Sequence, residues 1–193
     1  MKILKILLGI LFIATVGYAY YKIPQWLFEG TAISNTLAGL VLIVDGILLF
    51  KKKKMPMAIY QMVVCFIMTV YIVTTFLTAF NFTNSFSFDD GFMFLHSVNP
   101  IIFFMIYLFT TKLELKENKD IFIRSCIAPL FIVLYLIFDL TRKQIVGEYV
   151  YQLIPNNTNI ILVFLFGIIA YVLEVAFNYG IIKLKKVAES KLK

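Results

Sequence analysis

The chain has 193 residues, of which 61% are apolar and only 15% charged, and its mean hydropathy is +0.90. Soluble domains are about half apolar and about a quarter charged, so this composition excludes an ordinary soluble domain. The net charge of +7 comes from Lys and Arg at the ends of apolar runs, where membrane proteins collect them. No basic patch is interleaved with aromatic residues, so the charge does not indicate nucleic-acid binding.

Six apolar runs follow one another along the chain, each close to the length of roughly 20 residues that crosses a bilayer. They are predicted at about 3–21, 33–50, 55–80, 92–110, 121–140 and 160–182. Because hydrocarbon offers no water to backbone polar groups, each run is expected to be a helix. The first run is interpreted as a retained helix because it lacks a signal-peptide cleavage site. The predicted fold class is all-α, a polytopic membrane protein with six transmembrane helices in one domain, 1–193.

The distribution of Lys and Arg predicts the orientation of these helices. The side that holds both termini carries 15 basic residues, and the other side carries three. The three are Lys22, Arg142 and Lys143. Cytoplasmic loops are enriched in Lys and Arg, so both termini are expected in the cytoplasm and the protein in the cell membrane.

The second run carries polar residues at both ends. Thr31, Ser34 and Asn35 lie at its outer end and Asp45 toward its inner end. At about 100° per residue, Ser34 and Asp45 lie on nearly one helix face. Thr and Ser commonly cap helix starts, and capping is the simpler interpretation of Thr31 and Ser34.

The fourth run holds His96, the only histidine, followed by Asn99 and Pro100. An interhelical hydrogen bond is the simpler role of a polar residue in a helix bundle. Thr31 and His96, however, both lie close to the outer ends of their helices. A hydroxyl and an imidazole at matched depth can act as a nucleophile and its general base.

Three charged residues fall in the inner half of the predicted bundle, namely Asp45, Arg124 and Glu174. Buried charges need partners, so these residues are predicted to form a structural ion-pair cluster. A proton or ion relay is the alternative. Cys65 and Cys126 lie inside apolar runs and are interpreted as small apolar fillers, and no metal or cofactor is expected.

Three short motifs resemble those of a known family. Residues 31–35 (TAISN) look like the T-x-x-S-N signature of bacterial six-span proteins related to the androgen-induced-gene and androgen-dependent TFPI-regulating protein family. Residues 96–100 (HSVNP) look like the H-x-x-x-P motif of that group, and residues 147–151 (GEYVY) look like its G-x-[WY]-V-Y-P element. The order of the motifs agrees with that family, so the resemblance covers most of the chain.

The resemblance implies a threonine hydrolase that cleaves the ester bond in fatty acid esters of hydroxy fatty acids. Matched by motif, the nucleophile is Thr31 and the base is His96. The expected substrate is a membrane lipid or another acyl ester. Residues expected to bind substrate or the oxyanion are Ser34, Asn35, Asn99, Tyr149 and Tyr151.

Two other functions stay open at the level of sequence. The first is a small transporter or ion pathway that uses Asp45, Arg124 and Glu174. The second is a non-catalytic membrane assembly protein, in which Thr31 and His96 tolerate substitution. The sequence does not predict an oligomeric state.

Overall fold

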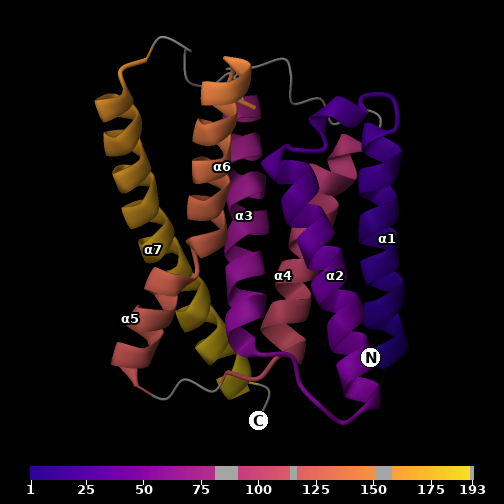
Figure 1. Cartoon of the computed structure of the whole chain (residues 1–193). Coiled ribbons are helices and arrows are strands. Elements are labelled where there is room, and N and C mark those ends of the chain that lie inside the picture. Colours follow the sequence, from indigo (N-terminus) through magenta and orange to yellow (C-terminus); the bar gives the residue numbers. More distant parts are fainter. Residues whose placement is uncertain (81–90, 114–116, 151–157, 192–193) are drawn as a thin grey trace.

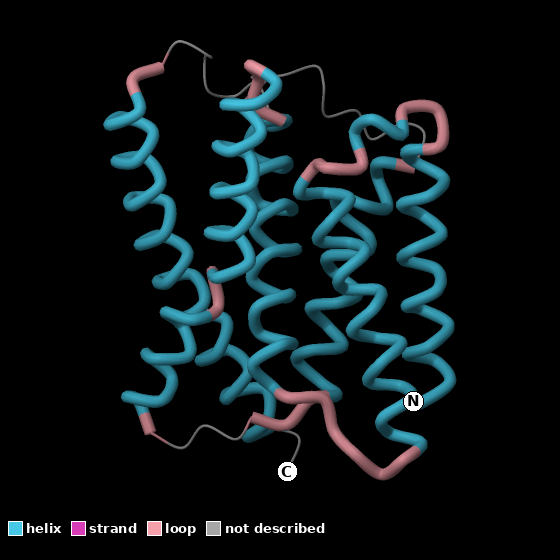
Figure 2. Tube along the Cα trace, viewed as in Figure 1, coloured by secondary structure: helices cyan, strands magenta, loops and turns pink. Residues whose placement is uncertain are grey.

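This computed structural model describes residues 1–80, 91–113, 117–150 and 158–191, whose regular secondary structure is helical. The described residues contain no strand, which confirms the all-α class for them (Figures 1 and 2). The elements are α1 (Lys2–Tyr20), η1 (Pro24–Trp26), α2 (Gly30–Phe50), α3 (Met57–Ala79), η2 (Phe94–Val98), α4 (Asn99–Thr110), α5 (Asn118–Ile127), α6 (Leu130–Val146) and α7 (Ile160–Lys191). The element η2 is one turn of π-helix that leads directly into α4.

Five helical segments of the described residues are long and apolar enough to cross a membrane. They are α1, α2, α3, the segment Asn118–Val146 that comprises α5 and α6, and α7. The apolar helix Phe94–Thr110, formed by η2 and α4, is shorter. Large apolar side chains such as Phe164 and Leu173 of α7 lie on the outer surface and are more than 60% exposed. Soluble monomers rarely expose large apolar patches, so the structure supports a multi-pass membrane protein.

The fifth apolar run, predicted as one helix over 121–140, is interrupted. Proline lacks the backbone N–H and its ring clashes with the preceding turn, so α5 ends at Ile127 and α6 begins at Leu130, after Pro129. The helix α6 then continues to Val146, beyond the predicted end. Gly147 stops it by adopting the left-handed conformation at φ +90°, which favours glycine.

Two further boundaries differ from the prediction. The helix α2 begins at Gly30 rather than near residue 33, so Thr31 lies inside its first turn. The helix α7 continues to Lys191 rather than ending at 182. The ammonium of Lys185 donates to the carbonyl oxygens of Leu108 and Thr111 at 2.5 Å each, which holds this extension of α7 against the end of α4.

The helices α1 and α2 pack closely along their length because glycines face one another. A Cβ atom added to Gly9 would lie 2.5 Å from the carbonyl oxygen of Gly39, and one added to Gly46 would lie 2.6 Å from the side chain of Ile6. Small residues permit such close approach of helices in membranes. In Figure 1 the two helices run side by side, and α7 ends at the end of the bundle where α1 begins.

Candidate functional site

Thr31 and His96, 65 positions apart in the sequence, come together near one end of the bundle. The hydroxyl Oγ1 of Thr31 lies 3.4 Å from Nε2 of His96. Both residues are buried, with exposed fractions of 1% and 3%.

The interpretation of Thr31 and Ser34 as helix caps is wrong, because Glu29 occupies the N-cap position of α2 and no side chain caps this helix.

His96 lies in the π-helical turn η2. The N–H of Asn99 donates to the carbonyl oxygen of Phe94, five residues earlier. The next bond of this pattern would run from residue 100 to Leu95, but Pro100 has no N–H to donate. The carbonyl oxygen of Leu95 instead accepts from Nδ2 of Asn35 at 3.0 Å. Proline thus opens a backbone acceptor that ties the helix carrying His96 to the helix carrying Thr31.

Three of the residues expected to bind the oxyanion are used to position Thr31. The Asn35 amide also donates to the carbonyl oxygen of Thr31 at 2.8 Å, and the Ser34 hydroxyl donates to the same oxygen at 3.2 Å. Nδ2 of Asn99 donates to Oδ1 of Asn35 and to the hydroxyl of Thr15 in α1, each at 3.0 Å. The amide hydrogens of Asn35 and Asn99 therefore all bind acceptors within the protein. This network joins α1, α2 and α4 around the first turn of α2.

A cavity of about 190 Å³ lies beside Thr31, between the start of α2 and helices α3 and α6. Its lining residues are Gly30, Thr31, Phe66, Thr69, Val70, Val73, Thr74, Ile132, Tyr135 and Leu136. Val73 and Leu136 are about 40% exposed on the apolar outer surface, at 40% and 37%. The cavity therefore opens toward the apolar outer surface between α3 and α6.

Tyr135 is a site residue that the sequence analysis missed. It lines the cavity, its ring lies 5.8 Å from that of Phe66, and a Cβ atom on Gly30 would lie 3.6 Å from it. A tyrosine within an apolar run combines an apolar ring with a polar hydroxyl, and this combination was the only feature of the sequence that could have indicated Tyr135. No motif marks the position, so only the packing of α6 against α2 and α3 reveals it.

Glu29, immediately before the first turn of α2, was also missed. Its carboxylate accepts a hydrogen bond from the Tyr20 hydroxyl at 2.5 Å, which ties α2 to the end of α1. Burial raises the pKa of Glu29, and the hydrogen bond from Tyr20 opposes this rise in part. A carboxyl group with a raised pKa therefore lies two residues from Thr31.

The described residues of the last motif, 147–150, do not line the cavity. Tyr149 is buried beneath the ammonium of Lys143, which lies 5.0 Å from the ring centre, and it is not among the residues that line the cavity. Asp139 of α6 accepts a hydrogen bond from the N–H of Val150 at 2.6 Å and fixes this turn. Tyr151 lies outside the described residues.

The predicted cluster of Asp45, Arg124 and Glu174 is not assembled. Asp45 pairs instead with Lys5 of α1, whose Nζ lies 2.5 Å from Oδ2. Glu174 accepts from the thiol of Cys65 at 3.5 Å. No ion pair joins the three residues, all of which are described. Helical periodicity gave their faces and depth, but it could not show that α1 supplies the cation for Asp45.

A chain of polar side chains runs through the interior between α3, α4 and α7. The hydroxyl of Tyr107 donates to Oε1 of Gln61, and Nε2 of Gln61 donates to Oδ1 of Asn178 at 3.0 Å. Nδ2 of Asn178 contacts Sγ of Cys65 at 2.7 Å, which leads to Glu174. Cys65 is therefore part of a polar network rather than only an apolar filler.

No family model, no curated protein and no solved structure matches the chain. The site is therefore interpreted from its own geometry.

Proposed function

We propose that the protein is an intramembrane lipid ester hydrolase with Thr31 as nucleophile and His96 as general base. The observation that carries the proposal is the 3.4 Å approach of Thr31 Oγ1 to His96 Nε2 beside a cavity. Catalytic hydrogen bonds are often this long before substrate binds and shorten in the reactive complex. The proposal includes distant membership of the androgen-induced-gene and androgen-dependent TFPI-regulating protein family, which the motifs resemble.

In the proposed first step, Thr31 Oγ1 attacks the ester carbonyl carbon and its proton passes to Nε2 of His96. The tetrahedral intermediate collapses, the C–O bond to the alcohol breaks, and His96 returns the proton to the leaving alkoxide. Water then attacks the acyl-threonine with His96 again accepting a proton. Release of the fatty acid regenerates the Thr31 hydroxyl, so the cycle needs no other reactant.

The first turn of α2 offers donors for the oxyanion. An α-helix leaves the N–H groups of its first turn without intrahelical acceptors, and the partial positive charge of the helix start favours an anion. In α2 the first helical hydrogen bond runs from the N–H of Ile33 to the carbonyl oxygen of Glu29. The N–H groups of Gly30 and Ala32 therefore belong to the part of the first turn that precedes this bond. Gly30 lines the cavity next to Thr31. We propose that its N–H stabilises the oxyanion, with Tyr135 binding the substrate.

The substrate proposed is an acyl ester of the bilayer, with fatty acid esters of hydroxy fatty acids as the first class to test. The cavity is lined by apolar residues apart from three threonines and Tyr135, and its rim reaches the apolar outer surface. Such a site favours acyl chains over water-soluble esters, since burial of each methylene contributes about 0.8 kcal/mol.

We further propose six crossings with both termini in the cytoplasm of a bacterial cell. The helix Phe94–Thr110, fourth along the chain, would then be a short crossing in addition to the five long segments. The ratio of 15 to 3 basic residues supports this orientation. Reporter fusions after Lys53 and after Lys193 should report the cytoplasm, and one after Lys22 the opposite side.

The test of the hydrolase is labelling by a lipophilic fluorophosphonate of the full chain in detergent or vesicles. Wild-type protein should be labelled, and Thr31→Ala and His96→Ala should each reduce the rate by about 100-fold or more. Thr36→Ala, a control in the same helix, should label at the wild-type rate. Unchanged labelling in Thr31→Ala, or none in the wild type, would exclude the proposed nucleophile.

The interior chain of polar side chains favours proton movement as a second candidate function. It links Tyr107 to Glu174 through Cys65, and the hydroxyl of Thr69, which lines the Thr31 cavity, donates to the carbonyl oxygen of Cys65 at 2.8 Å. A pH-driven flux in liposomes that is lost in both Glu174→Gln and Gln61→Leu would support this function. Flux equal to that of empty liposomes would exclude it.

A further inference from the structure

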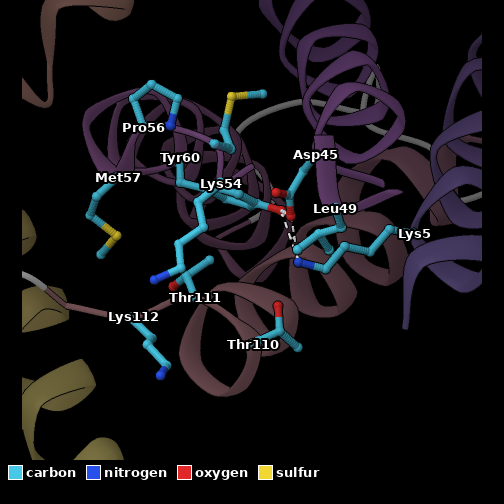
Figure 3. A pocket seen from close by; sticks show the side chains of 11 residues that line it. Lys5, Asp45, Leu49, Lys54, Pro56, Met57, Tyr60, Thr110, Thr111 and Lys112 are labelled. Atoms are coloured by element: carbon cyan, nitrogen blue, oxygen red, sulfur yellow. Dashed lines mark hydrogen bonds and ion pairs between the residues drawn. The ribbon is translucent and has the colours of Figure 1, made fainter. Parts of the chain in front are cut away.

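A second cavity, of about 400 Å³, opens at the other end of the bundle between α1, α2, α3 and the residues that follow α4 (Figure 3). Its floor is a buried polar triad. Nζ of Lys5 lies 2.5 Å from Oδ2 of Asp45 and 3.4 Å from the hydroxyl of Tyr60, which itself donates to Oδ2 at 2.7 Å. Lys5 neutralises Asp45, so the floor carries no net charge.

The rim of this cavity carries two further cations. Lys54 lies in the loop between α2 and α3, and Lys112 follows α4. Both are exposed, and neither takes part in a hydrogen bond or ion pair within the described part of the chain. Three lysines against one aspartate give the lining a net charge of +2. The cavity therefore favours an anion.

The position of the cavity along the helices matches the level of lipid headgroups. Asp45 lies five residues before the end of α2, about 7.5 Å along the axis at 1.5 Å per residue. Tyr60 lies three residues after the start of α3. Leu49, Met55 and Met57 complete the wall with apolar side chains. Cations above an apolar wall suit a phosphate group with hydrocarbon attached.

We propose that this cavity binds a phosphate ester, and that in the membrane the ester is the headgroup of an anionic phospholipid. Lys54 and Lys112 bind the phosphate oxygens. Lys5, whose ammonium has three hydrogens and two partners, donates its third hydrogen from the floor. The binding site is independent of the proposed hydrolase, because Thr31 lies at the opposite end of α2.

The experiment is native mass spectrometry of the purified full chain with lipids of identical acyl chains. Phosphatidylglycerol, phosphatidylcholine and the soluble glycerol 3-phosphate are compared as ligands. Wild-type protein should prefer phosphatidylglycerol. The variant Lys54→Gln/Lys112→Gln should bind it about tenfold or more weakly, since a basic residue at a membrane surface contributes about 1 kcal/mol. Lys54→Arg/Lys112→Arg should retain binding, which separates the loss of charge from damage to the fold.

The matched control is Lys51→Gln/Lys53→Gln, which removes the same charge from exposed positions in the same loop that do not line the cavity. This control should bind phosphatidylglycerol within twofold of the wild type. An equal loss in the control, or equal binding of phosphatidylcholine by the wild type, would overturn the site. Displacement of the lipid by an equal concentration of glycerol 3-phosphate would overturn the lipid as the source.

Discussion

At the residue scale, the reactivity proposed for Thr31 depends on neighbours that hold its backbone. Asn35 is the central one, because its amide joins the carbonyls of Thr31 and Leu95. Asn35→Ala leaves the buried Leu95 carbonyl without this partner, so the free energy of unfolding should fall by about 2 kcal/mol. Fluorophosphonate labelling should become slower yet stay above that of Thr31→Ala. Labelling at the wild-type rate would show that Asn35 does not position the nucleophile.

The buried pair of Lys5 and Asp45 gives a second prediction at this scale. Their side chains are 3% and 6% exposed, so removal of one leaves the other charge buried without its partner. Lys5→Met or Asp45→Leu alone should lower the free energy of unfolding by about 3–5 kcal/mol. The double variant should recover most of this loss, because no unpaired charge remains. Additive losses, measured by thermal unfolding in detergent, would contradict the pairing.

Glu29 predicts a dependence of stability on pH. Its pKa in the folded protein lies above 4.5, the ordinary value of a glutamate, so the folded state binds a proton more readily than the unfolded state. The stabilisation contributed by the protonated carboxyl is fully present below about pH 4.5 and is lost as pH rises through the folded-state pKa. Glu29→Gln should remove this part of the pH dependence of the melting temperature. A parallel profile in Glu29→Gln would assign it to other groups.

At the scale of elements, the contact between α1 and α2 predicts unequal effects at two glycines. A Cβ atom on Gly39 would lie 2.8 Å from the carbonyl oxygen of Gly9, whereas one on Gly17 meets nothing within 4 Å. Gly39→Ala should therefore destabilise the protein by about 1–3 kcal/mol, as overpacking does. Gly17→Ala, the control in α1, should be neutral or slightly stabilising. Equal melting temperatures of the two variants would contradict the close packing.

The helical elements themselves followed from the apolar runs, whereas their interruptions did not. Pro100 removes a backbone donor from the fourth run, but only the structure shows the π-turn around His96 and the Asn35 amide that donates to the carbonyl of Leu95. Pro129 broke the fifth run into α5 and α6. A proline marks where a hydrogen bond is missing, but the tertiary partner of the freed carbonyl decides the local geometry.

At the scale of the whole molecule, two polar regions lie at opposite ends of the bundle with a polar chain between them. Thr31 and His96 belong to one end, and Lys5 with Asp45 to the other. The proposed hydrolase site and the proposed lipid site can therefore be tested separately. Phosphatidylglycerol binding should persist in Thr31→Ala, and labelling of Thr31 should persist in Lys54→Gln/Lys112→Gln. Loss of both in either variant would show that the two ends are coupled.

The sequence by itself determined the helical class and the approximate helix ends, because hydrogen bonding inside hydrocarbon is satisfied locally, within four residues. It also singled out Thr31 and His96 as candidate site residues, through residue chemistry and depth. Only the tertiary structure decided which helices are neighbours: that His96 approaches Thr31, that Lys5 rather than Arg124 pairs with Asp45, and that Tyr135 lines the cavity. Periodicity gives the face and depth of a residue on its own helix, but the packing of side chains between helices decides what that face meets.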